Sequence, residues 1–595
     1  MTKNRKCLVA DFETINKPDD CRVWAWGCAE VGKPETFEYG NQIYQFMESI
    51  CFDRLNNYDI YFHNLGFDGM FIMYWLFQNG FTHVENKDDL VPMTFTTLIS
   101  DMGQFYQIEV CKEVYKGKKN YVRFLDSLKV IPLKVDEIGK NFGLDTLKIH
   151  HEDEFYNKHR EIGHILNQEE IDYLKNDVIV MCKALDIVFK IGLTKMTIAS
   201  CALTNFKKLF GETKFKSNFP ILDFEVDQEL RQAYKGGWVY CKEDMKYTPH
   251  KNGRVYDVNS LFPSRMYLEK LPYGKPLRFK GKYKDDSIYD LYVQRIKCDF
   301  ELKEGYLPTI QIKHGKFVEN EYLKSSNGES VELFLSNVDL EVFFKHYDVI
   351  VYEWKGGYKF KSTTGMFKKY IDYWSETKIE SKKNGNKALY QIAKLMLNSL
   401  YGKFALNPMV RSKYPVYDEK SKLIKFKYGD YETRDSIYVP MGLFITAYAR
   451  KYTIEGAQAN YDRFCYADTD SIHLVGDYEP EGLEVDSTKL GAWDFELKFE
   501  RAKYLRQKCY LESYRVDKFR KKPLDGFYLL KDKITVAGMP ESCYKEVTFD
   551  NFNIGGEYYG KMYRKNVTGG LILYRDYYRI RQNKIWHNIK YVVIL

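Results

Sequence analysis

Acidic residues set into apolar runs are the feature that most restricts how this chain can fold. The run Tyr466–Ser471, which contains Asp468 and Asp470, has apolar residues on both sides and predicts a β-hairpin with the aspartates at its turn. Asp257 lies in a second apolar run, where a buried carboxylate without a partner is costly. We therefore expect Asp257 to lie beside Asp468 and Asp470.

Three aspartates placed in this way suit phosphoryl transfer. That reaction uses two divalent ions roughly 3.5–4 Å apart, one activating the attacking oxygen and one holding the leaving group. Carboxylate oxygens suit Mg²⁺ or Mn²⁺, so two such ions per active site are predicted. Asp and Thr are also favoured in ordinary hairpin turns, and the run 468–470 alone leaves that alternative open.

A second acidic set lies near the N-terminus. Asp11 and Glu13 alternate in a predicted strand that starts at Cys7, so both side chains point to one face. Asp68 follows the run Tyr61–Phe67. These positions suit a second metal-binding site, and the alternative is that they are unrelated acids at strand ends.

A helix supplies the fourth carboxylate of this set. Asn167 and Glu170 form a capping-box pattern, which predicts a helix through about Phe189. Tyr173 and Asp177 are four residues apart and lie on one face of it. The four carboxylates would bind two ions around a scissile phosphate, with the tyrosine orienting a water molecule. A helix-surface acid is the alternative for Asp177.

A cationic helix is predicted over Lys387–Phe404. Lys387, Lys394, Asn398 and Tyr401 form one polar stripe on it. Lys394 can neutralise triphosphate oxygens, while Asn398 and Tyr401 face a base and sugar. A solvated amphipathic face is the alternative interpretation.

Other elements follow from the hydrophobic pattern. The N-terminal part alternates strands and helices, which indicates an α/β domain that ends near residue 197. The predicted elements are strands or β-like runs at Ile60–Asn64, Ile296–Leu302, Pro308–Ile312 and Asn407–Tyr431, and helices at Gly69–Phe77 and Tyr438–Ala459.

Composition adds limits on partners and location. A chain of 595 residues is expected to form about three or four domains. The segment from Lys498 to Leu595 has 21 Lys and Arg against 10 Asp and Glu, which favours a surface for a polyanion or, alternatively, a solvated basic face. Apolar stretches are too short to cross a membrane, and dispersed cysteines predict a reduced cytosolic protein without structural zinc.

Two acidic sets with a cationic helix predict an enzyme that both makes and removes phosphodiester bonds. In its ordered motifs the chain resembles the family B DNA polymerases, and most closely the protein-primed polymerases of phi29-type bacteriophages. The resemblance runs from Asp11 to about Leu573. The matching strings are Asp257–Pro263, Glu301–Tyr306, Leu335–Leu340, Lys394–Phe404, Asp468–His473 and Arg501–Lys508.

The resemblance implies an α/β (α+β) multidomain fold, with an RNase H-like 3′-5′ exonuclease domain and a right-hand polymerase of palm, fingers and thumb. Two inserts are implied, one for terminal-protein interaction and one that encircles DNA for processivity and strand displacement. The implied ranges are 1–197 exonuclease, 198–270 palm, 271–367 first insert, 368–406 fingers, 407–435 second insert, 436–535 palm, and 536–595 thumb and tail.

The resemblance also assigns residues. The motifs of the family's exonuclease are matched by the four carboxylates Asp11, Glu13, Asp68 and Asp177, by Tyr173, and by His63 and Asn64. An alternative for His63 is a half-buried structural histidine. The implied contacts to the single-stranded primer end and the auxiliary lysine are Thr14, His63, Asn64, Phe67, Ser127, Leu128 and Lys148.

In the polymerase part, the resemblance implies metal ligation by Asp257, Val258 and Asp470, with Asp468 also catalytic. The implied nucleotide contacts are Phe262, Lys378, Lys394, Asn398 and Tyr401. The implied DNA contacts are Tyr234, Gly236 and Gly237 in the motif that coordinates synthesis with proofreading, Thr446 and Arg450 on the template, and Lys508 and Tyr510 at the primer end.

The implied partners are primer-template DNA, dNTPs and a terminal protein whose hydroxyl primes synthesis. A monomer acting in the cytoplasm of an infected bacterial host, without a membrane, is expected. The chain departs from the family at Phe262, where the family usually has Tyr, in a longer fingers loop between Lys378 and Lys394, and in a tail after about Tyr574. A nuclease without synthesis, or a binding protein with a vestigial polymerase fold, are the competing hypotheses.

Overall fold

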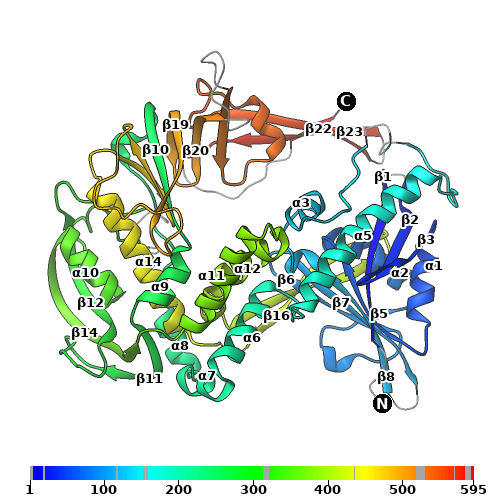
Figure 1. Cartoon of the computed structure of the whole chain (residues 1–595), viewed down its shortest axis with the longest axis horizontal. Helices are drawn as coiled ribbons and strands as arrows, with labels where there is room; N and C mark the ends of the chain where they lie inside the picture. The colour runs from blue at the N-terminus through cyan, green and yellow to red at the C-terminus, as the bar shows by residue number, and fades with distance from the viewer. Residues whose placement is uncertain are drawn as a thin grey trace. The chain divides into compact units, whose positions relative to one another are not determined.

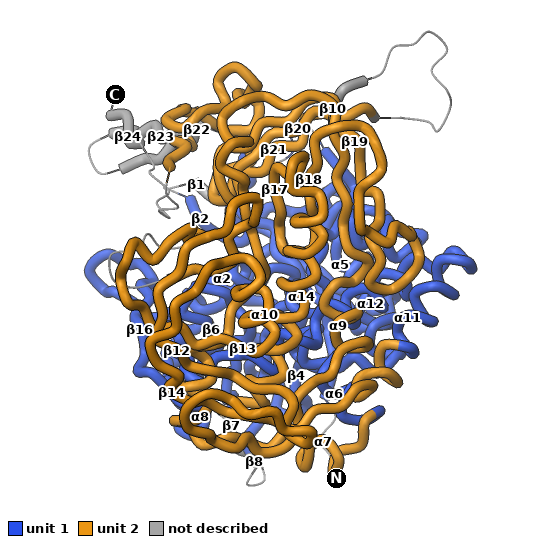
Figure 2. The backbone as a smooth tube through the Cα atoms, turned by 90° about the vertical axis from the view of Figure 1, so that its left-hand side faces the viewer, with its two compact units in different colours: residues 1–209, 372–435 blue, residues 210–371, 436–595 orange. Residues whose placement is uncertain are grey.

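The computed structural model divides into two compact units, which are described separately (Figure 2). Unit 1 comprises Met1–Leu209 and Asp372–Asp435, and unit 2 comprises Phe210–Ile371 and Ser436–Leu595. The seven predicted domain ranges stay a proposal. The structure describes all residues except 1–4, 18–19, 116–117, 152–154, 156–157, 313–320, 435, 517–528, 568–569, 583–590 and 595.

Unit 1 is built on a ten-stranded sheet in the order β16-β15-β6-β7-β8-β4-β1-β2-β3, with β5 paired to β6. Its strands are β1 (Arg5–Lys17), β2 (Asp20–Glu30), β3 (Lys33–Gly40), β4 (Asn57–Phe62), β5 (Thr82–His83), β6 (Thr94–Ser100), β7 (Phe105–Tyr115), β8 (Lys118–Asp126), β15 (Met409–Asp418) and β16 (Leu423–Thr433). The central strands β1, β4 and β8 are parallel, and their apolar side chains enter the core. The predicted strands at Cys7 and Ile60 are confirmed as β1 and β4.

Helices α1, α2 and α5 contact strands of this sheet, and Figure 1 shows α5 lying along β1 and β2. The helices are α1 (Ile43–Cys51), α2 (Leu65–Gln78), α3 (Val135–Asn141), α5 (Gln168–Lys190), α6 (Ile198–Phe210), α11 (Lys368–Lys383), α12 (Lys387–Ser399) and α13 (Tyr401–Phe404), with 3₁₀ turns η1 (Lys87–Asp89) and η2 (Ser127–Lys129). The predicted start of α5 is confirmed, because Asn167 Oδ1 accepts from the Glu170 N–H at 2.9 Å and Glu170 Oε2 accepts from the Asn167 N–H at 3.1 Å.

The predicted helix over Lys387–Phe404 is confirmed in its range, but it is not continuous. The helix is interrupted at Leu400, between α12 and α13. The Lys403 N–H donates to the Leu400 carbonyl, three residues back, at 3.1 Å. This spacing is that of a tight 3₁₀ turn, and Gly402 lies within it. Apolar periodicity cannot detect such a change in the backbone hydrogen bonds.

The predicted β insertion over Asn407–Tyr431 is confirmed as the hairpin β15–β16. The hairpin extends the sheet of unit 1, because Ser412 and Lys413 pair with Ser100 and Ile99 of β6. Tyr417 on β15 packs on the rings of α2. A strand contributed from about 300 residues further along the chain therefore covers an edge that would otherwise be unpaired.

Unit 2 contains a seven-stranded sheet in the order β21-β20-β19-β10-β18-β17-β9, a four-stranded sheet in the order β11-β14-β12-β13, and a three-stranded sheet in the order β22-β23-β24. The strands are β9 (Val239–Cys241), β10 (Pro249–Val258), β11 (Leu271–Phe279), β12 (Leu291–Leu302), β13 (Val331–Ser336), β14 (Tyr347–Thr363), β17 (Phe464–Asp468), β18 (Ser471–Val475), β19 (Trp493–Arg506), β20 (Cys509–Val516), β21 (Leu529–Val536), β22 (Glu557–Val567), β23 (Gly570–Arg579) and β24 (Tyr591–Ile594).

The helices of unit 2 are α7 (Glu212–Asn218), α8 (Phe224–Arg231), α9 (Leu261–Leu268), α10 (Asn337–His346) and α14 (Val439–Ala459), with η3 (Glu243–Met245) and η4 (Glu541–Glu546). The predicted helix at Tyr438 and the predicted hairpin at Phe464 are confirmed as α14 and β17–β18. The predicted strand at Pro308–Ile312 is wrong. Among the described residues of this segment, only Ile310 forms a bridge, to Leu323, and no described strand pairs with it.

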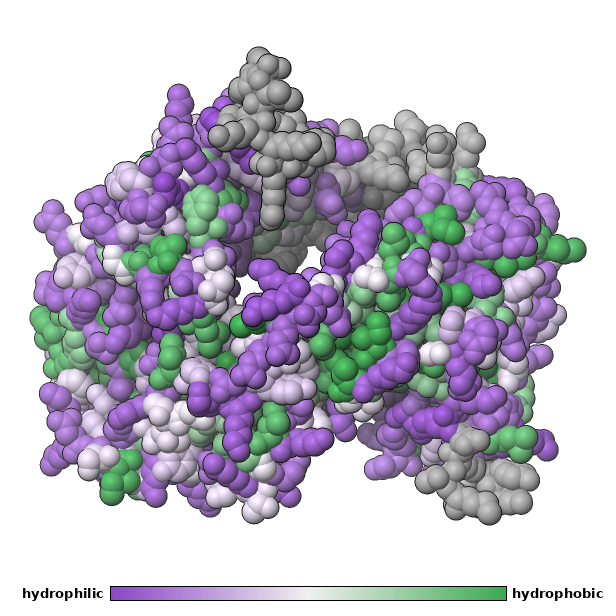
Figure 3. Space-filling model, viewed as in Figure 1, coloured by the Kyte–Doolittle hydropathy of each residue, from purple (hydrophilic) through white to green (hydrophobic). Residues whose placement is uncertain are grey.

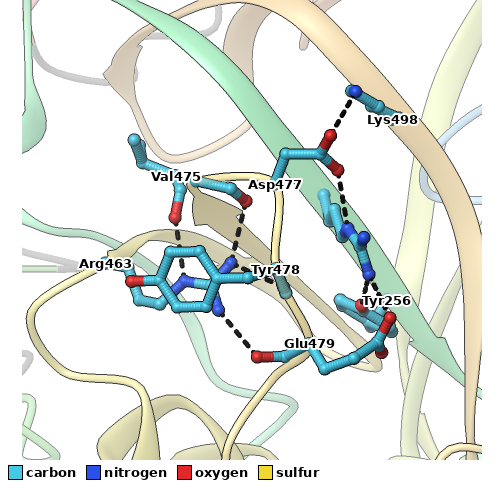
Figure 4. A network of polar contacts seen from close by, with 9 residues as sticks. Tyr256, Arg463, Val475, Asp477, Tyr478, Glu479 and Lys498 are labelled. Carbon is cyan, nitrogen blue, oxygen red and sulfur yellow. Dashed lines mark hydrogen bonds and ion pairs between the residues drawn. The ribbon is translucent and has the colours of Figure 1, made fainter.

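An arginine anchors the loop that follows β18 (Figure 4). The Arg463 side chain donates to the carbonyls of Val475, Gly476, Tyr478 and Glu479 at 2.8–3.1 Å. Its guanidinium lies 3.6 Å from the centre of the Tyr478 ring. One cation thus binds four carbonyls at the end of β18 and in the loop that follows it.

Hydrophilic residues cover most of the face shown in Figure 3, with smaller apolar patches between them. Within the part of the chain that the structure describes, no helix is both long and apolar enough to cross a bilayer.

Candidate active sites

Unit 1 contains a pocket of about 240 Å³. The four predicted carboxylates, the predicted tyrosine, three of the predicted primer-end contacts and the predicted auxiliary lysine line it. These residues are Asp11 and Glu13 from β1, His63 and Asn64 from the turn before α2, Phe67 and Asp68 from the start of α2, Lys148 from a loop, and Tyr173 and Asp177 from α5. The elements β1, α2 and α5 therefore bring the four carboxylates into one pocket, which their spacing in the sequence could not show.

Burial and mutual repulsion oppose ionisation of these carboxylates. Burial, and then the charge of Asp177, raises the pKa of Asp11 to about 7. Burial and the charge of Asp11 raise the pKa values of Glu13 and Asp68 well above their usual range. Burial also raises the pKa of Asp177, although the Lys148 ammonium contacts its Oδ2. A cation bound in the pocket would therefore favour the charged forms of these carboxylates.

The donor set fits a divalent cation. Oδ1 of Asp68 and Oδ1 of Asp177 are buried and accept no hydrogen bond from the described residues. Buried carboxylate oxygens normally have partners, and Mg²⁺ or Mn²⁺ binds such oxygens. In the described part of the chain, no three acidic, histidine or cysteine side chains already lie close enough to hold one ion together. Ion binding would therefore require small side-chain movements.

Hydrogen bonds at both ring nitrogens hold His63 in place. Nε2 lies 2.8 Å from the Leu133 carbonyl, and Nδ1 lies 3.0 Å from the Ser127 hydroxyl. Burial lowers the pKa of His63, and Nε2 is the nitrogen that donates, because it faces a carbonyl. The Ser127 hydroxyl also lies 3.0 Å from the Phe62 carbonyl. Ser127 is only 1% exposed. The structure gives Ser127 a role in positioning His63, and its predicted DNA contact stays a prediction.

Sequence reasoning missed Asp126. Its Oδ1 accepts hydrogen bonds from the backbone N–H groups of Asn64 at 3.1 Å and Leu128 at 3.0 Å. The carboxylate thus ties together two segments predicted to bind a single strand. The sequence feature that could have identified Asp126 is its position at the end of an apolar run, directly before Ser127. Thr14 and Leu128 are half-buried and are not among the residues that line the pocket.

Strand pairing in unit 2 brings the other acidic set together. Ser471 of β18 lies opposite Asp257 of β10 and also opposite Asp468 of β17. The Val258 N–H donates to the Asp470 carbonyl at 2.8 Å. The predicted proximity of Asp257 to the two aspartates is therefore confirmed.

The turn between the aspartates is tightly packed. Thr469 has a left-handed backbone (φ 65°), and the Asp470 N–H donates to the Asp468 carbonyl at 2.7 Å. The Thr453 hydroxyl on α14 donates to the Thr469 carbonyl at 2.7 Å. A Cβ on Gly237 would lie 2.6 Å from the Thr469 side chain, so this position accepts only glycine.

The predicted primer-end residues lie next to this turn. The Lys508 ammonium contacts Asp468 Oδ1, and the Lys508 N–H donates to the Tyr466 hydroxyl at 2.9 Å. Tyr510 is 6% exposed, with its ring centroid 5.0 Å from that of Tyr466. Burial, with a contribution from the charge of Asp468, raises the pKa of Asp470. A positive charge thus lies at the acidic turn on the side of β20.

The predicted template contacts on α14 are buried. Arg450 forms a two-pronged salt bridge with Asp339 at 2.8 Å and donates to the carbonyls of Lys235 at 2.6 Å and Gly236 at 2.9 Å. Thr446 is 1% exposed and donates to carbonyls of its own helix. Sequence reasoning missed Asp339. Both α14 side chains make their hydrogen bonds within the protein. Their contacts with DNA stay predictions.

The predicted fingers residues lie in unit 1. Lys394 and Asn398 are exposed one turn apart on α12, whose opposite face is buried. Burial, and then the charge of Lys394, lowers the pKa of Lys378. Two ammonium groups near one another suit an anionic ligand. In unit 2, Phe262 is half-buried and packs against the core beneath β17 and β18.

Comparisons with known proteins agree with this geometry. The family model of DNA polymerase type B, organellar and viral, matches residues 53–488. The chain is 46% identical, over 97% of its length and 99% of the relative, to the DNA polymerase of Bacillus phage phi29. It is 33% identical, over 96% of its length and 98% of the relative, to that of Streptococcus phage Cp-1. A phi29 DNA polymerase structure complexed with primer-template DNA and incoming nucleotides matches with a TM-score of 0.89 at 44% identity, covering 97% of this chain and 100% of that one.

Proposed function

The chain belongs to the organellar and viral type B DNA polymerases and is a DNA-directed DNA polymerase, and from this premise we propose that it is the protein-primed, proofreading replicative enzyme of a phi29-type bacteriophage. The observation that carries the proposal is that each unit contains its own set of acidic residues. The pocket of unit 1 suits hydrolysis, and the hairpin of unit 2 suits nucleotidyl transfer.

In unit 2, Asp257, the backbone of Val258 and Asp470 would hold two Mg²⁺ or Mn²⁺ ions. Such ions, when bound, stabilise charge on the attacking and leaving oxygens. Lys508, next to Asp468, would receive a primer phosphate. The Thr453 hydroxyl and the Val258 N–H keep the turn rigid, so the carboxylates require little reorganisation during the reaction.

In unit 1, Asp11, Glu13, Asp68 and Asp177 would hold the ions for 3′-5′ hydrolysis. Tyr173 lies one turn before Asp177 on α5 and would orient the attacking water. Lys148 partly offsets the negative charge of the pocket. His63, Asn64 and Phe67 line the same pocket and would contact the terminal nucleotides, with Phe67 exposed enough to stack on a base.

The partners follow from the relatives. A phi29 polymerase structure contains primer-template DNA and incoming nucleotides, and we assign both ligand classes to this chain. Lys378 and Lys394 would bind the triphosphate, which would relieve their mutual repulsion, and Asn398 and Tyr401 would face the base and sugar. A terminal protein would supply the priming hydroxyl and contact the range 271–367. The enzyme would act as a monomer in the cytoplasm of the infected bacterium.

Primer extension with all four dNTPs tests this proposal, paired with digestion of single-stranded DNA in the absence of dNTPs. We expect both activities with Mg²⁺ and neither with EDTA. Digestion without extension would support the hypothesis of a nuclease without synthesis. Absence of both activities in folded protein would support the hypothesis of a binding protein.

Deleting about 408–430 should spare short extension on open templates but shorten rolling-circle products and impair strand displacement. The deletion removes the β15–β16 hairpin and uncovers β6, so a milder variant is needed. Tyr428→Ala with Tyr431→Ala keeps the hairpin but removes two exposed rings that lie 4.0 and 4.8 Å from the Arg411 guanidinium. This variant should melt like wild type and still shorten products. Wild-type product length in both variants would exclude the role.

Phe262 is expected to exclude ribonucleotides by packing its ring where a 2′-OH would lie. Phe262→Tyr should add little selectivity, because one hydrogen bond contributes about 0.5–1.5 kcal/mol. Phe262→Val should admit rNTPs and weaken dNTP binding, because ring packing is lost. Steady-state incorporation of dATP against ATP opposite a template T, for all three proteins, measures this. Unchanged selectivity in the valine variant would assign the gate to another residue.

A further inference from the structure

A polar network is buried beneath the acidic hairpin of unit 2. His473 on β18 is 1% exposed and Glu512 on β20 is 0% exposed. His473 Nδ1 lies 2.5 Å from Glu512 Oε1, and the Tyr504 hydroxyl donates to the same oxygen at 3.0 Å. Glu512 Oε2 is buried and has no hydrogen-bond partner among the described residues. The carboxylate is therefore held through one oxygen by two side chains from two other strands.

The pair connects strands that are not neighbours. The sheet order places β10 and β19 between β18 and β20. The sheet must curl to bring them together, and Tyr466 of β17 accordingly stacks on Tyr504 of β19, with ring centroids 5.7 Å apart. His473 also approaches the Tyr510 ring, at 5.2 Å between centroids. Side chains therefore set the separation of β18 and β20, because no backbone ladder joins these two described strands.

These two parts of the sheet carry the two halves of the polymerase site. The hairpin β17–β18 carries Asp468 and Asp470, and the hairpin β19–β20 carries Lys508 at its turn and Tyr510 on β20. Two contacts at the surface end join them, from Lys508 to Asp468 and to the Tyr466 hydroxyl. In the interior, the histidine–glutamate pair adds a hydrogen-bonded connection to the ring contacts of Tyr466 with Tyr504 and of His473 with Tyr510.

Stability alone does not account for this buried polar pair. A buried ion pair contributes little net stability compared with apolar residues of similar shape, whereas removing one partner is strongly destabilising. Burial opposes the charged form of Glu512, but its contact with His473 and, to a smaller extent, Lys533 on β21 lower the pKa of Glu512. Hydrogen bonds are directional, so those between His473 and Glu512 fix the position of β18 relative to β20.

We propose that His473 and Glu512 are positioning residues of the polymerase site, which brace the hairpin of Asp468 and Asp470 against that of Lys508 and Tyr510. Their role is to set the place of the primer terminus relative to the catalytic aspartates. The inference rests on the proposed roles of those four residues in synthesis.

The test compares Glu512→Leu with Glu512→Gln in the full chain. Glutamine keeps an acceptor for His473 and Tyr504, whereas leucine keeps only the approximate volume. Because a misplacement of about 1 Å can cost about 10²-fold, Glu512→Leu should lower kcat for extension by up to about that factor. The KM for dNTP should change much less than kcat. Glu512→Gln should retain most of the activity, and digestion of single-stranded DNA by unit 1 should be unchanged in both variants.

A double variant separates positioning from stability. His473→Leu with Glu512→Leu replaces the pair with apolar residues and should restore the melting temperature without restoring kcat. Asp477→Asn is the matched control, because Asp477 pairs with Arg254 and Lys498 at the exposed end of β18 (Figure 4) and should not affect extension. A wild-type kcat in Glu512→Leu, or recovery of kcat together with melting temperature in the double variant, would overturn the proposal. Absence of extension by the wild type would instead refute the proposed roles in synthesis.

Discussion

Asp470→Ala is expected to abolish primer extension. Asp470 lies at a turn held by the Val258 N–H and the Thr453 hydroxyl, and it is one of the carboxylates that would hold the divalent ions. Loss of charge stabilisation worth several kcal/mol corresponds to at least about a 10³-fold fall in kcat. Single-turnover extension of a matched primer with saturating dNTP measures the effect.

The same variant provides its own control. Digestion of single-stranded DNA should persist, because the pocket that would perform it lies wholly in unit 1. DNA binding should also survive, since the Lys508 side chain is retained. Asp470→Asn keeps the size and removes only the charge, and it should fail in the same way. Extension at the wild-type rate by either variant would show that Asp470 is misassigned.

Asp11→Ala combined with Glu13→Ala is expected to eliminate 3′-5′ digestion and leave polymerisation intact. Both side chains lie on one face of β1 in the pocket with Asp68 and Asp177. Removing two of four carboxylates leaves too few oxygen ligands for two ions. Digestion of a 5′-labelled single strand without dNTPs measures the loss, and primer extension on the same preparation measures what remains.

Folding of this double variant can be checked independently. Burial and repulsion disfavour the charged forms of Asp11 and Glu13, so their removal should not lower the melting temperature measured in EDTA. Persistent digestion would show that the acidic set of unit 1 is misassigned. Loss of both activities together with a lower melting temperature would indicate misfolding.

Much of the site could be predicted from local pattern. The α/β multidomain fold class is confirmed, and so are the capping box at Asn167, the hairpin of Asp468 and Asp470, and the face shared by Tyr173 and Asp177. Each of these depends on residues within one turn of helix or one hairpin, so spacing determines which side chains share a face. The break at Leu400 and the missing strand at Pro308 were not predicted, because they depend on hydrogen bonds that apolar periodicity does not reveal.

Residues that act through distant partners escaped the sequence. Asp126 joins two segments through backbone N–H groups, and Asp339 binds an arginine that lies 111 residues away in the chain. Ser127, Thr446 and Arg450 were expected to contact DNA, yet the structure buries their side chains in internal hydrogen bonds. Whether a polar side chain faces solvent or another element cannot be read from its own neighbours in the chain.

The sequence by itself determined which groups are available for the proposed chemistry: two acidic sets, a cationic helix, and the motifs that place the chain among the type B polymerases. Local spacing suffices for this, because residue type and helix or strand period fix which groups can act together. Only the tertiary structure decided which side chains complete each site. It joined β15 to β6, curled the sheet so that His473 meets Glu512, and set Arg450 on Asp339. Such contacts depend on packing among residues far apart in the chain, and no local pattern encodes them.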